Sequence, residues 1–344
     1  MSFAAERHGR PILRTRSPPR KTACSTAVRD PRRRFLLALQ SAILSAVLRG
    51  LLMPSPPGLT YRDGPPDPEH RKAIHRLLLD IFDVDVSPID AFCLADPTYR
   101  AFSYLDAAGC VVANAATFTL KLIIAGKLVH AMGIQSVATR PEWRRRGLSH
   151  DLLQRALEWC DASARLTFLM TVIPGFYEPM GFRTVPQFAY VGGTPDVAPR
   201  AACCRRLDLN ADQDRRLLAR ILHHRVPVSA RFAVDGSAGS FVLNLFDQAE
   251  LSAWYIETAQ AIVVTTERSD GTLCMVDIAA DRMPTLAEIV AAFANQPKQV
   301  EIHFPPDRLA WAGIPTPAQT STVLMVRGNL PPLEPFMIPA TAAF

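Results

Sequence analysis

The chain has 344 residues, of which 49% are hydrophobic and 20% are charged, a composition typical of a globular protein with room for about two domains. Glycine and proline are not abundant enough for a collagen-like or low-complexity protein. The formal net charge of +6 comes from residues 1–34, which hold ten lysines and arginines but only two acidic residues. Such a segment predicts a disordered basic tail, and it does not predict a nucleic-acid-binding domain.

The seven cysteines are an odd number and show no paired Cys-x-x-Cys motifs. This spacing argues against a zinc site and against a disulfide framework. Reduced thiols are typical of the cytosol, so we expect a cytoplasmic protein without a bound metal.

An apolar run, Phe35–Met53, follows three consecutive arginines. Its length approaches the roughly 20 residues that span a bilayer, and basic residues before an apolar stretch are also typical of a signal peptide. A glutamine and an arginine interrupt the run, which makes a membrane or export role the less favoured prediction. The alternatives are an amphipathic helix packed on the body, or a protein whose real first residue is Met53. Residues 1–57 are in either case expected to lie outside the catalytic domain.

Residues 58–195 carry an alternation of patterns that predicts one α/β domain with a mixed sheet, after a Pro/Gly-rich linker at 54–66. Apolar residues recur at helical spacing after the N-cap pair Asp67-Pro68, which predicts an amphipathic helix. A second helix is expected after Gly147, with Cys160 on its apolar face. The other expected elements are strands at 101–105, 110–122, 128–137, 166–173 and 183–192, and a short helix at 176–180.

Residues 207–335 are expected to form a second, smaller α/β domain after a linker at 195–206. Helices are predicted at 212–223 and 285–293, and strands at 241–245, 254–256, 261–267, 273–278, 300–304 and 323–326. The order strand, loop, helix, strand from 273 to 304 repeats the order from 128 to 173. This repetition leaves two interpretations open, a degenerate second copy of the first domain or an unrelated α/β domain.

The segment Arg144-Arg145-Arg146-Gly147-Leu148-Ser149 lies between a predicted strand and the start of a predicted helix. Unpaired backbone N–H groups and the positive end of the helix dipole favour an anion at such a position. Gly147 would let the backbone approach that anion closely, and the arginines would add charge against a phosphate. A solvated basic turn is the alternative for this segment when it is taken alone.

Two neighbouring segments favour the anion site. The pattern Arg144-x-x-Gly147-x-Ser149 resembles the Gln/Arg-x-x-Gly-x-Gly/Ala signature of GNAT N-acetyltransferases, with serine in the last place. Upstream, Gly133–Pro141 resembles the fourth strand of that family, and downstream Phe176–Phe182 resembles its Phe-Tyr-x-x-x-Gly-Phe segment. The three segments occur in the order and spacing of the family. The resemblance covers about residues 60–193, and in the C-terminal region it reaches only the order of elements.

The resemblance implies acetyl-CoA as the cosubstrate and assigns residues to it. Val137, Ala138 and Thr139 stand where the family's splayed strand offers backbone groups to the pantetheine arm. The pyrophosphate would be wrapped by Arg145, Arg146, Gly147, Leu148, Ser149 and His150. Tyr177 stands where many members place a tyrosine that protonates the departing thiolate, the alternative being a core aromatic with a satisfied hydroxyl.

The implied mechanism is direct attack of an amine on the thioester, polarised by backbone N–H groups, with no cysteine nucleophile. The residue that removes the amine proton is less well defined. The fourth strand offers His130 and Gln135, and Glu178 adjoins the tyrosine. A further idea is the carboxylate of Phe344, because some relatives with added C-terminal domains direct their last residue at the active site.

Two features depart from the family pattern. Pro174-Gly175 stands where relatives often have an asparagine, which puts the contacts to the far end of CoA in doubt. The second region has Asp281–Thr285 in place of the Arg/Gly loop, so it should not bind CoA. We therefore expect one cofactor site, in the first domain.

The sequence thus predicts an N-acetyltransferase that acts on a primary amine of a small molecule or a peptide. A non-catalytic CoA- or metabolite-binding regulator on the same scaffold is the alternative. Thiol release over a panel of amines would separate the two. The acceptor and the oligomeric state stay open at this point.

Overall fold

The computed structural model describes residues 56–198, 203–293 and 297–344. The segment 35–53 and the basic tail lie outside these residues. In the described ranges, no helix is long and apolar enough to cross a membrane.

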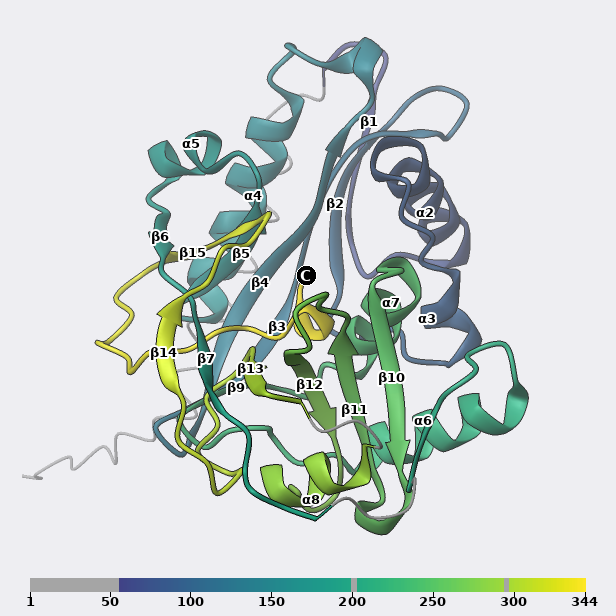
Figure 1. Cartoon of the computed structure of the whole chain (residues 1–344). Coiled ribbons are helices and arrows are strands. Elements are labelled where there is room, and N and C mark those ends of the chain that lie inside the picture. The colour runs from purple at the N-terminus through teal and green to yellow at the C-terminus, as the bar shows by residue number, and fades with distance from the viewer. Residues whose placement is uncertain (1–55, 199–202, 294–296) are drawn as a thin grey trace, which may run out of the picture.

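The first sheet contains eight strands, most of which lie in the upper part of Figure 1. Its order is β1-β2-β3-β4-β5-β15-β6, and β9 pairs with the far end of β3. The bounds are β1 Thr60–Gly64, β2 Arg100–Leu105, β3 Val111–Ile124, β4 Lys127–Thr139, β5 Thr167–Thr171, β6 Arg183–Val185, β9 Phe232–Asp235 and β15 Val323–Arg327. Only β4 and β5 run parallel to each other among these neighbours. The predicted α/β class with a mixed sheet is confirmed.

Helices cover both faces of this sheet. Helix α2, Pro68–Phe82, begins at the N-cap Asp67, whose side chain accepts a hydrogen bond from the His70 amide. It packs on one face with α3, Ser87–Ala91. Helix α4, Leu148–Ser163, packs on the other face through the apolar stripe that the sequence predicted. Cys160 is fully buried in that stripe, and burial raises the pKa of its thiol to about 12, so its prediction as a core residue is confirmed.

The second sheet contains seven strands in the order β14-β7-β13-β12-β11-β10-β8 and lies lower in Figure 1. Its strands are β7 Phe188–Gly193, β8 Cys204–Arg206, β10 Leu251–Ile256, β11 Ala261–Thr266, β12 Leu273–Ala279, β13 Gln299–Ile302 and β14 Ile314–Pro317. Helices α6 (Asp212–His224), α7 (Ala238–Asp247) and α8 (Leu286–Ala292) accompany it. A capping box between Thr285 and Glu288 starts α8.

Each sheet contains strands from both of the domains expected from the sequence. Strand β15, from the C-terminal region, lies between β5 and β6 and pairs with both. Strand β9 extends the edge of β3. Strand β7 follows β6 of the first sheet along the chain but belongs to the second sheet, where it pairs with β13 and β14. The two sheets are therefore interlocked rather than joined by one linker.

Three local predictions are wrong. Residues 241–245, predicted as a strand, belong to helix α7, where Phe241 and Leu245 are buried one turn apart. The linker predicted at 54–66 contains β1, which pairs with β2. The single strand predicted at 183–192 is two strands, β6 and β7, that belong to different sheets. A short apolar run has no period that separates a strand from a buried helix, which explains the first error.

Candidate active site

The two parallel strands β4 and β5 separate soon after they meet. Their ladder contains two pairs, Met132 with Thr167 and Gly133 with Phe168. Beyond Gly133, no described strand pairs with the edge of β4 that faces β5. The predicted cofactor residues Val137, Ala138 and Thr139 all lie on this unpaired stretch. Backbone groups left free at such an edge need a partner, and an amide-containing ligand can supply it.

A bulge occupies β4 at the point of separation. The β3–β4 register shifts between Asn114 and Ala116, so that β4 gains an extra residue there. Ser136, in the bulge, has a φ of 56°, which is in the left-handed region that non-glycine residues rarely adopt. Strain of this kind is concentrated at functional sites. The sequence analysis missed Ser136, because a serine carries no local signal for a positive φ.

A buried chain of hydrogen bonds holds this bulge. Asn114 Nδ2 donates to the Ser136 carbonyl at 2.8 Å, and Ser103 Oγ donates to Asn114 Oδ1 at 2.7 Å. Because that hydroxyl proton is used, Ser103 accepts from His70 Nε2, at 2.9 Å. Ser103 and Asn114 are fully buried and His70 is 3% exposed. Burial lowers the pKa of His70, so its neutral form is favoured.

Tyr99 joins the same group from the loop before β2. Its hydroxyl interacts with the side chains of Ser136 and Asn114, and burial raises its pKa. The bulge is thus held from the α2 face of the sheet by side chains of two strands, one helix and the loop before β2. An asparagine within an otherwise apolar stretch of β3 was the one sign of this network in the sequence.

The predicted anion loop follows β4 directly. A 3-10 turn, η1, spans Pro141–Trp143, and Gly147 is the N-cap of α4 with a φ of 76°. A Cβ at Gly147 would meet nothing within 4 Å, so the space above the helix terminus is open. Ser149 Oγ and Thr139 Oγ1 lie 2.6 Å apart. This hydrogen bond brings the end of the unpaired strand and the start of α4 together.

The three arginines of the loop differ in their partners. Arg144 Nε donates to the Thr139 carbonyl at 3.1 Å, and Arg146 donates to the Glu142 carbonyl at 3.0 Å. Arg146 also stacks over the Trp143 ring at 4.6 Å. Arg145 has a φ of 59° and is exposed. Arg144 and Arg146 therefore stabilise the loop through contacts within it, whereas Arg145 is exposed at a turn position with a positive φ.

The other predicted loop residues divide by burial. Leu148 is 3% exposed and anchors the first turn of α4 in the core. Ser149 is half-buried and His150 is exposed. The turn thus has a fixed apolar side and an open polar side.

Tyr177 ends the short helix α5, Pro174–Tyr177, which follows β5. Its ring packs against Phe176 and Phe182 with centroids 5.0 Å and 6.1 Å away. Burial raises the pKa of its hydroxyl to about 12. Among the described residues, that hydroxyl forms no hydrogen bond. The ring is thus a core side chain, and the role of its hydroxyl as a proton donor stays a prediction.

A cavity of about 1140 Å³ lies on the α2 face, between the two sheets. Gln135, Ser136 and the Phe344 ring line it, and the Phe344 ring packs edge-on against Phe118 with centroids 5.2 Å apart. The loop before α4 lies on the other face. His130, in contrast, is exposed near the β3–β4 turn and does not line the cavity, and Glu178 is exposed beside α5.

Among the described residues, one group of side chains has ligand atoms close enough for a metal ion, and one of its members, His303, lines the cavity. Cys274 Sγ, Glu301 Oε1 and His303 Nε2 lie within 4.8 Å of one another. Arg268 donates to the same Glu301 oxygen at 2.9 Å, and His303 Nε2 lies 2.7 Å from it. Burial alone would lower the pKa of His303, but the Cys274 and Glu301 side chains raise it to about 9. The protonated His303 and Arg268 both contact the Glu301 carboxylate, so Glu301 has two cationic partners within the chain itself.

Comparisons with known proteins match part of the chain to a family. Residues 95–185 match the model of the acetyltransferase (GNAT) domain. No curated protein matches the sequence. All three segments that carried the resemblance, 133–141, 144–149 and 176–182, fall inside the matched range.

Solved structures give a weaker likeness. A probable N-acyltransferase of unknown function from Enterococcus faecalis V583 is 15% identical, with a TM-score of 0.48 over 78% of this chain and 72% of that chain. A GCN5-related N-acetyltransferase from Kribbella flavida is 17% identical, with a TM-score of 0.47 over 78% and 71%. Eis1 from Mycobacterium abscessus is 15% identical, with a TM-score of 0.48 over 77% and 72%.

Because these TM-scores are below 0.5, the assignment rests on the family match and on the geometry of the chain itself. The match supports an acyltransferase, and the resemblance predicted from the three segments is confirmed. The chain therefore contains a GNAT acetyltransferase domain at residues 95–185.

Proposed function

We propose that the protein is an N-acetyltransferase that moves the acetyl group of acetyl-CoA to a primary amine. The observation that carries this proposal is the separation of β4 from β5 next to the open N-terminus of α4. The gap between β4 and β5 leaves an unpaired strand edge that can bind the amide-containing pantetheine arm. The N-terminus of α4 lies beside it and offers N–H groups to the phosphates.

In this proposal Val137, Ala138 and Thr139 bind the pantetheine arm through their backbone groups. The turn from Arg145 to His150 binds the pyrophosphate, with Gly147 giving the closest approach. The hydrogen bond between Thr139 and Ser149 keeps the two subsites in register. Arm and pyrophosphate are thereby held on the α4 face, with the thioester at the bulge.

The acceptor amine enters from the cavity on the opposite face. Its nitrogen attacks the thioester carbonyl carbon, the carbon–sulfur bond breaks, and backbone N–H groups near the bulge stabilise the developing oxyanion. The departing thiolate takes the proton of Tyr177, whose hydroxyl is protonated at neutral pH. The nitrogen releases its proton to water on the cavity side, and the Tyr177 phenolate regains a proton from solvent, so that the cycle closes.

Replacing Gly147 by valine tests the cofactor part of this proposal. A β-branched side chain is strained at a φ of 76° and would fill the open space above the helix terminus. We expect affinity for CoA to fall at least about tenfold, equivalent to about 1.4 kcal/mol of binding free energy. Isothermal calorimetry measures it.

Gly126→Val is the matched control. Gly126 has a φ of 74° in the β3–β4 turn and also has an open environment, so it carries the same backbone strain away from the site. Unchanged CoA affinity in Gly147→Val, or equal losses in both variants, would contradict the cofactor assignment.

Turnover on a panel of amines tests the catalytic part. Release of free thiol from acetyl-CoA that depends on the amine is the expected result. Tight CoA binding with no turnover on any amine would instead favour the non-catalytic regulator. Repeating the assay with longer acyl-CoA thioesters would show whether acetyl is the preferred group.

A further inference from the structure

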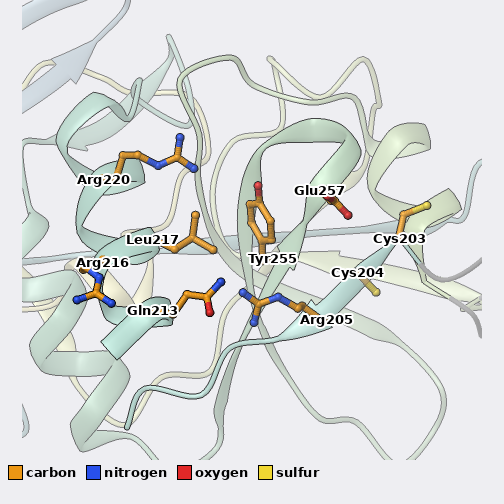
Figure 2. A pocket seen from close by; sticks show the side chains of 9 residues that line it. All are labelled: Cys203, Cys204, Arg205, Gln213, Arg216, Leu217, Arg220, Tyr255 and Glu257. Carbon is orange, nitrogen blue, oxygen red and sulfur yellow. The ribbon is translucent and has the colours of Figure 1, made fainter. Parts of the chain in front are cut away.

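A second cavity, of about 610 Å³, lies at the outer edge of the second sheet, away from the GNAT site (Figure 2). Helix α6 forms one wall, and strands β8 and β10 form the other. No residue of the α4 loop or of the bulge lines it. Its volume is in the range of cavities that hold small-molecule ligands.

Three arginines reach this cavity from two directions. Gln213, Arg216 and Arg220 follow one another at i, i+3 and i+7 along α6, so they share one face of that helix. Arg205 comes from β8, directly opposite Tyr255 in the register with β10. Figure 2 shows Arg205 and Gln213 directed toward each other, with Tyr255 between Arg205 and Arg220.

The charges of these arginines are not equally balanced. Arg205 is paired with Asp214 through two hydrogen bonds of 2.8 Å and 2.6 Å, and the Asp214 side chain is 7% exposed. This pairing lowers the pKa of Asp214 and fixes the Arg205 guanidinium in place. Within the described ranges, neither Arg216 nor Arg220 forms an ion pair. Glu257 supplies the one carboxylate in the lining.

We propose that this cavity binds the phosphate group of a small molecule. Guanidinium groups match phosphate oxygens in pairs, and the Gln213 amide and the Tyr255 hydroxyl add neutral donors. Arg205 is already held in place by Asp214, so it loses little side-chain freedom on binding. Arg216 and Arg220 supply the charge that no carboxylate of the described chain neutralises by contact.

The inference is independent of the proposed transferase activity, because the two sites use different elements. Pyrophosphate is a suitable probe. Its binding to the full chain is measured by calorimetry in the presence of saturating CoA, which occupies the α4 loop. We expect one remaining site, with an affinity that weakens as ionic strength rises.

The test variants are R216A and R220A, singly and together, and the matched control is R215A. Arg215 lies on the same helix and carries the same charge, but it pairs with Asp212 and does not line the cavity. We expect the double variant to lose at least about tenfold in pyrophosphate affinity and R215A to stay within about twofold. CoA affinity should be unchanged in all of them.

Three outcomes would overturn the inference. Wild-type protein in CoA could bind no pyrophosphate. R215A could lose as much affinity as the double variant, which would indicate a diffuse charge effect. The double variant could also keep wild-type affinity, which would place the phosphate elsewhere. Thermal melting of each variant confirms that it is folded, so that a loss of binding can be attributed to the cavity.

Discussion

Tyr177 is a buried core side chain to which the proposed function also assigns a chemical role. Its ring belongs to the core between α4 and the first sheet, whereas its hydroxyl has no partner that we identify in the described residues. Tyr177→Phe keeps the ring and removes only the proton donor. We expect turnover to fall on the order of 100-fold, with CoA affinity nearly unchanged.

Steady-state kinetics and calorimetry on this variant measure the two quantities separately. Phe176→Leu is a control, since Phe176 contacts the Tyr177 ring but offers no proton. If Tyr177→Phe turns over at the wild-type rate, the tyrosine is a core residue only.

Asn114 is the residue through which the buried network reaches the bulge. Asn114→Ala leaves the Ser136 carbonyl without its donor, so the strained backbone can relax away from the thioester. A misplacement of this kind lowers kcat on the order of 10- to 100-fold while KM for acetyl-CoA changes little.

Thr117→Val provides the comparison on the same strand. Thr117 is also fully buried, and its hydroxyl has no hydrogen-bond partner among the described residues. A general loss of folding would affect KM, kcat and melting temperature together. Equal kcat in Asn114→Ala and Thr117→Val would remove Asn114 from the site.

At the residue scale, the loop could be predicted and the bulge could not. Arg144, Gly147 and Ser149 form a pattern that can be recognised in one dimension. Ser136 and its support from His70 depend on a strand register, and that register is set by residues more than 20 positions away.

Among the elements, β4 depends on a close contact at Gly133. A Cβ there would lie 2.2 Å from the Phe118 ring, which in turn packs against Phe344 at the cavity. Gly133→Ala must therefore displace Phe118. We expect the free energy of unfolding to fall by about 1–3 kcal/mol, as measured by denaturant titration.

Gly175→Ala is the corresponding control, because a Cβ at Gly175 meets nothing within 4 Å. Its stability should stay within about 0.5 kcal/mol of wild type. A Gly133→Ala variant as stable as Gly175→Ala would show that Phe118 moves without cost.

Element types were predictable where the pattern was long. Helices α2 and α4 extend over four turns and carry a clear apolar face, and both begin where the sequence indicated. Helix α7 is shorter and mostly apolar, so its sequence pattern did not distinguish a helix from a strand. Strand β14 could not be predicted either, since its side chains are exposed and it contains two prolines.

For the whole molecule, the interlocked sheets predict that the N-terminal region does not fold independently of the C-terminal region. A fragment of residues 58–195, the domain expected from the sequence, lacks β9 and β15. Without β15, the edge of β5 and the edge of β6 that pair with it would be exposed. We expect this fragment to aggregate or to remain unfolded. Circular dichroism and size-exclusion chromatography, with residues 56–344 as the control, measure this.

A monomeric fragment with cooperative unfolding and full CoA affinity would show that the first sheet is complete without the C-terminal region. Strand pairing at this range could not be derived from the sequence. A short run of apolar residues indicates that β15 is a strand, but it does not indicate that its neighbours lie about 150 residues earlier.

The place of β15 also has a consequence for synthesis on the ribosome. Residues 323–327 leave the exit tunnel after nearly all of the chain, yet they fill the gap between β5 and β6. Until then the nascent GNAT domain carries two open strand edges. Long-range pairing of this kind slows folding and favours aggregation, so we expect chaperones that bind open edges to improve the yield of native protein.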